Sequence, residues 1–324
     1  MAKIMGKGFS YDDVLILPKY NKILSRKDVD LKTKVSRNIR LAIPLIAANM
    51  DTICEAEMAI AIGKLGGLGI IHRYLSIDSQ VKEIKKIKSE NLIAAAAIGI
   101  KDYLERVPKL IESGLELLVL DIAHGHSKYA GKTLDWIKKN YPQVDVMVGN
   151  IATKDAAHYF FSKGADAIKV GVGPGAACRT REVTGFGVPQ LSAIMDVARN
   201  KEYFPDVKII ADGGIKNSGD IVKALAAGAD TVMIGSLLAG CDEAPNPGEY
   251  YGNASEYVNN HRAPEGFYGT VKKTGPVEDV IKELAWGIRS GVSYGGATNL
   301  KELRENAEFI LCTAAGQIES SVRI

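Results

Sequence analysis

The sequence predicts a single (β/α)8 barrel, an α/β fold in which eight parallel strands close into a ring and helices surround them. Short apolar runs recur eight times, each ending in a small or polar residue and followed by a helical pattern. Continuous apolar runs are typical of parallel strands that are buried on both faces. Eight such units close naturally into a barrel. The predicted strands are Pro44–Asn49, Leu68–Ile71, Leu92–Ile98, Leu117–Asp121, Asp145–Gly149, Ala167–Gly171, Lys208–Asp212 and Thr231–Gly235.

Amphipathic segments lie between these runs and predict the surrounding helices. The clearest are Ser79–Lys88, Leu104–Ser113 and Ser218–Ala227. Several helical runs end at a glycine that precedes a strand, which is the expected position of a helix C-cap. These glycines, which we interpret as structural, are Gly66, Gly114, Gly164 and Gly228.

Size and charge narrow the class of protein. The chain has 324 residues, and α/β barrels of this size form one unit, so we expect a single domain over residues 1–324. A net charge of +3, without a long block of like charges, argues against a nucleic-acid polymer as partner. No stretch approaches the roughly 18 apolar residues that a membrane span requires. We therefore expect a cytoplasmic protein that binds no membrane.

The four cysteines are scattered along the sequence as Cys54, Cys178, Cys241 and Cys312, without CxxC spacing. A disulfide framework or a zinc site is therefore not expected. Cys178 differs from the other three, which we interpret as packing residues, because it follows a glycine-rich loop.

The loop that carries Cys178 lies in the longest interval between predicted strands, GVGPGAACRTREVTGFGVPQ, at the carboxyl end of the sixth strand. Active sites of this fold are built at that end of the barrel. The neighbouring Arg179 and Arg181 would favour the thiolate form of Cys178, which is the nucleophilic form. The alternative is a small buried cysteine in a tight turn. A second irregular stretch, residues 241–275, follows the eighth strand and is interpreted as a flap.

Two further glycine-containing loops follow the seventh and eighth strands, in IIADGG and MIGS. These are the loops that commonly bind phosphate in such barrels, through backbone N–H groups and a helix N-terminus. Asp212 would suit ribose hydroxyls. Its alternative roles are a helix N-cap or a buried acceptor at the end of a strand.

The strings ANMDT, at residues 48–52, and DIAHGHS, at residues 121–127, also end predicted strands. The two histidines beside Asp121 could suggest a metal, but the sequence offers no third ligand of matching geometry. A cofactor contact through Asp121 and the nearby backbone fits better.

Taken together, ANMDT, DIAHGHS, GVGPGAACRTR, IIADGG, MIGS and RAPEG resemble the family of IMP dehydrogenase and GMP reductase. The six motifs occur in the family's order, and the resemblance extends from FSYDDVLILP to TAAGQIES, which is nearly the whole chain. It implies a (β/α)8 barrel that assembles as a homotetramer and acts on a purine nucleotide, GMP or IMP.

The resemblance also implies the chemistry. Cys178 would attack C2 of the purine to form a covalent intermediate, and hydride would pass between C2 and a nicotinamide. Thr180 matches the threonine that follows the nucleophile, and Glu265 matches the flap glutamate paired with it. A hydroxyl–carboxylate pair can relay a proton to or from the group at C2.

Binding residues follow from the same resemblance. The nicotinamide cofactor would contact Asp121, Ala123 and Asn150, and the backbone carbonyls of Gly173, Gly175 and Cys178 would hold a potassium ion. The implied substrate-binding residues are Met50, Asp212, Gly213, Gly214, Gly235, Ser236, Tyr251, Gly252 and Arg262.

Within the family, the sequence is most like a reductase. Dehydrogenases usually insert a regulatory tandem domain after the second strand, whereas here IHRYLSIDSQ runs straight on to ENLIAAAAIG. A dehydrogenase hydrolyses its intermediate with an Arg-Tyr pair on a long flap, and the stretch from Tyr251 to Glu265 is short and has no Arg-Tyr. We therefore expect NADPH-dependent reductive deamination of GMP to IMP and ammonia. The alternative is an IMP dehydrogenase without the regulatory domain, which would oxidise IMP to XMP with NAD.

Overall fold

The structure is a computed structural model that describes residues 3–252 and 265–320. Its centre is a closed barrel of eight parallel strands in the order β10-β11-β4-β5-β6-β7-β8-β9. All eight predicted strands are confirmed, although four of them are shorter than the apolar runs suggested and one, β8, is longer. The strands are β4 (Leu45–Ala47), β5 (Leu68–Ile71), β6 (Ala95–Ile98), β7 (Leu117–Asp121), β8 (Asp145–Ile151), β9 (Ala167–Val170), β10 (Lys208–Asp212) and β11 (Thr231–Ile234).

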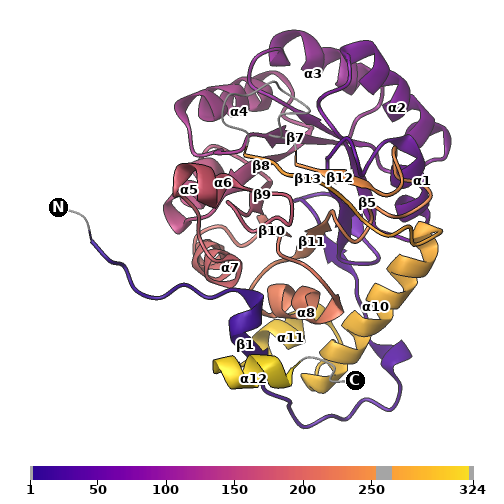
Figure 1. The fold of residues 1–324 in the computed structure, drawn as a ribbon. Helices are drawn as coiled ribbons and strands as arrows, with labels where there is room; N and C mark the ends of the chain where they lie inside the picture. The colour runs from indigo at the N-terminus through magenta and orange to yellow at the C-terminus, as the bar shows by residue number, and fades with distance from the viewer. Residues whose placement is uncertain (1–2, 253–264, 321–324) are drawn as a thin grey trace.

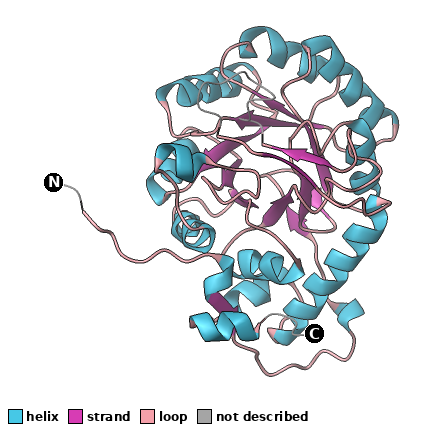
Figure 2. Cartoon of the chain, viewed as in Figure 1, coloured by secondary structure: helices cyan, strands magenta, loops and turns pink. Residues whose placement is uncertain are grey.

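Helices surround the barrel on all sides (Figures 1 and 2). The three amphipathic segments singled out in the sequence form α2, α3 and α8. Helices α2 and α3 pack an apolar face onto the outer side of the strands and leave a polar face to solvent. Helix α8 is largely buried, because α10 and α11 pack against it. The helices that follow the strands are α1 (Ala56–Lys64), α2 (Ile77–Ser89), α3 (Tyr103–Glu112), α4 (Lys128–Asn140), α5 (Lys154–Ser162), α7 (Gln190–Ala198), α8 (Ser218–Ala226) and α10 (Val277–Tyr294).

Local sequence signals set the ends of these helices. Side chains of Ser76, Ser127, Thr153 and Asn217 accept hydrogen bonds from backbone N–H groups in the first turns of α2, α4, α5 and α8. The four predicted C-cap glycines all adopt positive φ angles. These are Gly66 (86°), Gly114 (98°), Gly164 (87°) and Gly228 (121°). Since left-handed backbone strains any residue with a Cβ, the glycines let the chain turn from each helix into the next strand.

The connection between β5 and α2 consists of residues 72–76 alone. The barrel therefore continues without interruption after its second strand. Among the described residues, no helix is both long and apolar enough to cross a membrane.

Elements outside the barrel repeat come from both ends of the chain and from two long loops. Strand β1 pairs antiparallel with β14, so that segments far apart in sequence form a small sheet beside α12 (Figure 1). The remaining elements are η1 (Tyr11–Asp13), β1 (Val14–Ile16), η2 (Arg26–Asp28), β2 (Thr33–Lys34), β3 (Arg40–Leu41), α6 (Thr180–Thr184), η3 (Arg199–Glu202), β12 (Glu249–Tyr251), β13 (Tyr268–Thr270), α11 (Leu300–Asn306), β14 (Phe309–Leu311) and α12 (Ala314–Glu319).

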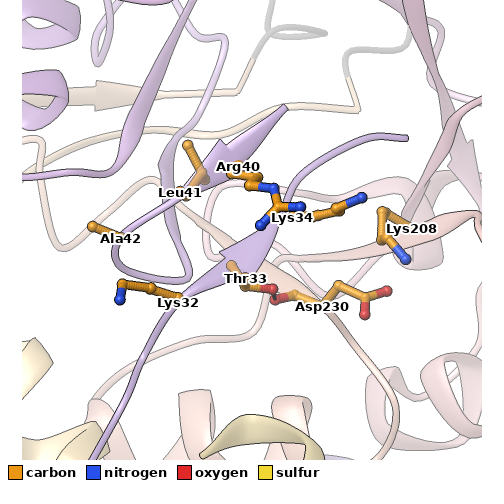
Figure 3. Close-up of a pocket in the computed structure, with 8 residues that line it drawn as sticks. All are labelled: Lys32, Thr33, Lys34, Arg40, Leu41, Ala42, Lys208 and Asp230. Atoms are coloured by element: carbon orange, nitrogen blue, oxygen red, sulfur yellow. Dashed lines mark hydrogen bonds between the residues drawn. The ribbon is translucent and has the colours of Figure 1, made fainter. Parts of the chain in front are cut away.

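An open basic hollow of about 470 Å³ lies at the amino-terminal end of the barrel strands (Figure 3). Lys208, which begins β10, and Asp230, which precedes β11, both line it. Lys32, Lys34 and Arg40 supply further positive charge. Because strands β10 and β11 run away from this hollow, it lies at the opposite end of the barrel from Asp212. It is not the site in which the motif residues gather.

Candidate active site

The predicted site residues gather at the carboxyl ends of the barrel strands. Asp121 ends β7, Asp212 ends β10, and Gly235 directly follows β11. The loop of residues 171–178, here called the cysteine loop, follows β9. This is the end of the barrel at which the fold presents catalytic loops.

Three residues form a chain of polar contacts that begins at the cysteine. The Cys178 thiol lies 3.2 Å from the Thr180 hydroxyl and donates toward it. The Thr180 hydroxyl in turn donates a hydrogen bond of 2.6 Å to Oε2 of Glu265. Cys178 is partly exposed. A nucleophile, a hydroxyl and a carboxylate in this order can move a proton away from the thiol and return it later.

The flap base, which we define as residues 249–252 together with 265–270, holds Glu265 in place. Its strands β12 and β13 pair antiparallel. The backbone N–H of Arg179 donates to the carbonyl of Glu265 at 2.5 Å, and the N–H of Phe267 donates to the carbonyl of Ala177 at 2.9 Å. The flap base thus forms an antiparallel bridge with the cysteine loop, between Gly266 and Cys178.

Arg179 and Arg181, which were expected to give Cys178 cationic surroundings, have other partners among the described residues. Arg179 forms an ion pair with Glu182 at 3.0 Å, on its own short helix. Arg181 packs against Gly173 and Gly187 and donates to the carbonyl of Val188 at 2.8 Å. Both guanidinium groups are therefore engaged by partners other than Cys178. The turn into α6 sets the direction of both side chains.

The other cysteines differ in burial. Cys54 and Cys241 are fully buried, and burial raises the pKa of both thiols. Their interpretation as packing residues agrees with these positions. Cys312 is only partly buried and lies just after β14.

The predicted phosphate loops lie against the cysteine loop. Gly213 and Gly214 have positive φ angles of 99° and 79°. A Cβ on Gly213 would lie 2.9 Å from the ring of Pro174 and 3.0 Å from the backbone nitrogen of Gly175. The two loops therefore approach each other as closely as backbone atoms allow, which explains the need for glycine.

The turn after β11 meets a tyrosine that the sequence interpretation missed. A Cβ on Gly235 would lie 3.3 Å from the hydroxyl of Tyr250 and 3.5 Å from Sδ of Met50. Burial and the nearby Asp212 and Cys178 raise the pKa of Tyr250 to about 12, so its hydroxyl stays protonated. Tyr250 therefore presents a hydrogen-bond donor between the nucleophile and the phosphate loops.

The predicted Tyr251 lies on the other side of the same strand. Its ring stacks on Tyr268 at a centroid distance of 6.1 Å, and it makes a hydrogen bond to Asp51. Alternate side chains of a strand point to opposite faces, so only one of two adjacent tyrosines can face the cysteine loop. Gly252 follows and bonds to the carbonyl of Phe267.

Asp212 is an acceptor at the end of a strand. Its Oδ2 accepts hydrogen bonds from Asn150 at 2.8 Å and from Lys169 at 3.0 Å. It does not cap the following helix, because Asn217 is the N-cap of α8. Of the two alternative roles considered from the sequence, the N-cap is therefore wrong.

Asp121 belongs to the same charged cluster. Its Oδ1 accepts a hydrogen bond of 3.0 Å from Lys169, and its Oδ2 lies 3.6 Å from Nε of Arg73. Burial alone would raise the pKa of Asp121, but the charges of Lys169 and Arg73 outweigh burial and keep that pKa below its ordinary value. In the same way Asp212 and Asp121 raise the pKa of Lys169 against the effect of its burial. Asp121 and Lys169 therefore both carry their charges.

Lys169 and Arg73 were not predicted from the sequence. The available signal for Lys169 was a lysine within the otherwise apolar run AIKV of a buried strand. Charged residues are almost never buried unless paired, so such a lysine indicates a partner inside the barrel.

The three residues expected to contact a cofactor lie on neighbouring strand ends. Asp121 ends β7, Ala123 is exposed in the loop that follows, and Asn150 lies near the end of β8. The N–H of Asn150 donates to the carbonyl of Ile122 at 2.7 Å, which joins the two segments. His126, considered above as a metal ligand, packs its ring on Tyr159 and Phe160.

Unpartnered polar atoms collect at the same end of the barrel. Among the described residues, Oδ1 of Asp51, Oγ1 of Thr52 and Nε of Arg73 are buried and lack a hydrogen-bond partner. All three lie in the loops that follow β4 and β5. Since buried polar groups normally find partners, these atoms fit a site that accepts a polar ligand.

Three further groups of predicted residues are Arg262, the carbonyls of the cysteine loop and Ser236. Arg262 lies outside the described residues. The carbonyls assigned to a potassium ion belong to the cysteine loop, where Gly173 has a φ of 87° and the carbonyl of Gly175 accepts the N–H of Cys178 at 3.0 Å. Ser236 lies in the turn after β11, half-buried beside Gly235.

Comparisons with known proteins agree with this geometry. The model of the IMP dehydrogenase / GMP reductase domain matches residues 8–259 and 247–323. The inosine-5'-monophosphate dehydrogenase of Cryptosporidium parvum is 38% identical over 388 aligned positions, covering 99% of this chain and 96% of that protein. The enzyme of the same name from Aquifex aeolicus is 34% identical over 475 positions, covering 99% and 96% respectively.

Among solved structures, the chain is similar to a cysteine-to-alanine variant of GMP reductase from Trypanosoma brucei in complex with guanosine 5'-monophosphate. The TM-score is 0.92 at 30% identity, and 98% of each chain is covered. The chain therefore belongs to the IMP dehydrogenase / GMP reductase family of oxidoreductases.

Proposed function

We propose that the protein is a GMP reductase, which converts GMP to IMP and ammonia with NADPH. The observation that carries the proposal is the contact chain from Cys178 through Thr180 to Glu265. This chain of contacts supplies a nucleophile and a proton relay. The flap that carries Glu265 contains no Arg-Tyr pair between Tyr251 and Glu265 that could activate water.

The contact chain accounts for the first half of the reaction. The thiol proton of Cys178 passes through the Thr180 hydroxyl to Glu265, and the sulfur forms a bond to C2 of the purine. The bond from C2 to the amino nitrogen breaks, and the same proton returns from Glu265 to that nitrogen, which leaves as ammonia. No water molecule is consumed.

The second half requires a hydride. A bound nicotinamide supplies that hydride to C2. The bond between C2 and the sulfur of Cys178 then breaks, IMP is released, and the thiolate takes up a proton from solvent. Thr180 and Glu265 have no bond to make or break in this half.

The nucleotide would lie over the phosphate loops. The N–H groups of Gly213, Gly214, Gly235 and Ser236, with the hydroxyl of Tyr250, would bind its phosphate. Asn150 and Lys169 donate hydrogen bonds to Oδ2 of Asp212. Because the Asp212 side chain is also 21% exposed, its Oδ1 can accept hydrogen bonds from the ribose hydroxyls. Met50, Tyr251, Gly252 and Arg262 complete the proposed substrate set.

The proposed dinucleotide site uses the neighbouring strand ends. Asp121, Ala123 and Asn150 would contact the cofactor, beside Arg73, whose Nε is ion-paired with Asp121 at 3.6 Å but makes no hydrogen bond. We extend the proposal to a potassium ion on the carbonyls of Gly173, Gly175 and Cys178, because oxygen ligands suit such a cation. A cytoplasmic homotetramer is likewise proposed.

The second candidate is an IMP dehydrogenase, which would oxidise IMP to XMP with NAD. It is favoured by the names of the relatives that are 34% and 38% identical to the chain. The alignment with the Cryptosporidium protein spans 388 positions, whereas the alignment with the Aquifex protein spans 475. A dehydrogenase can therefore approach the compact length of this chain.

One assay separates the two candidates. The protein is incubated with GMP and NADPH, and in parallel with IMP and NAD, while the near-ultraviolet absorbance of the reduced nicotinamide is followed. A reductase lowers the absorbance in the first mixture and releases one ammonia for each NADPH consumed. A rise of absorbance in the second mixture alone would establish the dehydrogenase instead.

A further inference from the structure

Lys169 occupies an unusual position for a charged residue. It lies in β9 between Ile168 and Val170, which are fully buried, and only 3% of its own surface is exposed. Its amine reaches the carboxyl end of the barrel, where the proposed ligands bind. Burial of an ammonium group is unfavourable unless partners compensate for the lost hydration.

The partners of this amine come from three other strands. It donates 3.0 Å hydrogen bonds to Oδ1 of Asp121 in β7 and to Oδ2 of Asp212 in β10. It also donates to Oδ1 of Asn150 in β8. The amide nitrogen of Asn150 donates in turn to Oδ2 of Asp212 at 2.8 Å and to the carbonyl of Gly171 at 2.7 Å. One nitrogen atom thus holds two carboxylates within hydrogen-bond distance of itself.

The charges around the amine depend on one another. Among the described residues, a second cation at this cluster is Arg73, whose Nε lies 3.6 Å from Oδ2 of Asp121. Without the charge of Lys169, the two carboxylates would face each other and move apart, or one of them would take up a proton. Neither carboxylate would then keep its present orientation.

We propose that Lys169 is a positioning residue that orients Asp212 for the purine mononucleotide and Asp121 for the dinucleotide at the same time. Loss of its charge weakens the binding of both ligands together. The inference rests on the proposed function for the assignment of the two carboxylates to the two ligands, and it holds for either direction of the reaction.

Three variants of the full chain test this by calorimetric titration with GMP, IMP, NADPH and NAD. Asp212→Asn should weaken the mononucleotides alone, and Asp121→Asn should weaken the dinucleotides alone. Lys169→Gln should weaken both classes by about tenfold or more, the scale expected when charged hydrogen bonds are lost. Lys201→Gln is the matched control, because Lys201 pairs with the buried Asp230 at 2.8 Å near the opposite end of the barrel. It should bind both ligand classes as the unmodified chain does.

The pH dependence gives a readout that a merely structural role would not move. Lys169 and Arg73 keep the pKa of Asp121 below its ordinary value against the effect of burial, and Asn49 adds a hydrogen bond to this carboxyl group. In Lys169→Gln the dinucleotide affinity should therefore begin to fall at a higher pH as the solution is acidified. The unmodified chain should keep its affinity further into the acid range.

A double variant decides the matter if Lys169→Gln alone does not fold. Combining Lys169→Gln with Asp121→Asn leaves one carboxylate instead of two, and GMP should bind this protein about tenfold more weakly than it binds Asp121→Asn alone. Equal GMP affinity of those two proteins, or unchanged binding of both ligands by Lys169→Gln, would overturn the inference.

The proposed function fails separately. If the unmodified chain binds GMP and NADPH but reduces nothing, the proposed reaction is wrong and the inference is still decided by the affinities. An unmodified chain that binds none of the four nucleotides would overturn both.

Discussion

The hydroxyl of Thr180 and the carboxylate of Glu265 lie 2.6 Å apart, although 85 residues separate them in sequence. The contact exists because the flap base pairs with the cysteine loop through the backbone of Arg179 and Ala177. The proton relay is therefore built by the docking of a flap, and it can form only when the two loops meet.

Breaking the relay should reduce turnover without abolishing nucleotide binding. Thr180→Val removes the hydroxyl and Glu265→Gln removes the carboxylate, and each should lower kcat by about 10²–10⁴-fold, the usual contribution of a positioned acid or base. KM for GMP should change little, and Thr180→Ser should recover most of the rate because it keeps the hydroxyl. Steady-state assays of ammonia release measure this. Rates within about threefold of the unmodified chain for both Val and Gln variants would exclude the relay.

Removing the nucleophile should stop the chemistry completely. Cys178→Ala should bind GMP but release no ammonia, because no other group can form the bond to C2. Mass spectrometry of acid-quenched reactions should show a nucleotide adduct on the unmodified chain and none on the variant. Cys312→Ala is the control, since that thiol is also partly exposed but lies beyond β14. Full activity of Cys178→Ala would contradict the covalent route.

The barrel could be predicted from the sequence, because parallel strands that are buried on both faces consist of continuous apolar runs. Leu117–Asp121 and Lys208–Asp212 were predicted to the residue. Polar residues at the carboxyl ends of such strands have to converge once the sheet closes. The grouping of Asp121 with Asp212 is a consequence of the fold class alone.

The finer details of the site depend on side-chain direction, which sequence order does not specify. Tyr250 and Tyr251 are adjacent, and only the pairing of β12 with β13 decides which one faces the cysteine loop. Arg179 and Arg181 lie next to the nucleophile in sequence, yet both turn away from it in the structure. Lys169 was not predicted as a site residue, because it lies within an apolar run that indicates only a buried strand.

Tyr250 should contribute to phosphate binding. Its hydroxyl lies beside Gly235, and its raised pKa keeps it protonated, so it can donate a hydrogen bond to a ligand. Tyr250→Phe should weaken GMP binding by about tenfold, since hydrogen bonds to charged groups contribute roughly 1.5–3 kcal/mol. Guanosine, which has no phosphate, should bind both proteins alike. Tyr129→Phe, at an exposed position, should change neither affinity.

Tyr250 should also make the free energy of unfolding depend on pH in the alkaline range. Its pKa is raised from 10.0 to about 12 by burial and by Asp212 and Cys178. A raised pKa means that the folded state favours the protonated form, so the stabilisation is complete below pH 10 and is lost as the pH rises toward 12. Denaturant titrations of Tyr250→Phe should therefore show a smaller loss of unfolding free energy across this range. An identical loss in the two proteins would contradict the assignment.

A methyl group at Gly213 should disturb the nucleotide site in addition to destabilising the fold. The position has a φ of 99°, and a Cβ would lie 2.9 Å from Pro174 and 3.0 Å from the nitrogen of Gly175. Gly213→Ala should therefore cost about 1–2 kcal/mol in unfolding free energy from left-handed backbone alone, and it should also push the phosphate loop away from the cysteine loop. Gly275→Ala separates the two effects, because Gly275 has a φ of 79° with no atom within 4 Å of the added Cβ. Both variants should lose stability in denaturant titrations, whereas only Gly213→Ala should lose GMP affinity in a calorimetric titration. Equal GMP affinity in the two variants would show that contact between the loops does not shape the nucleotide site.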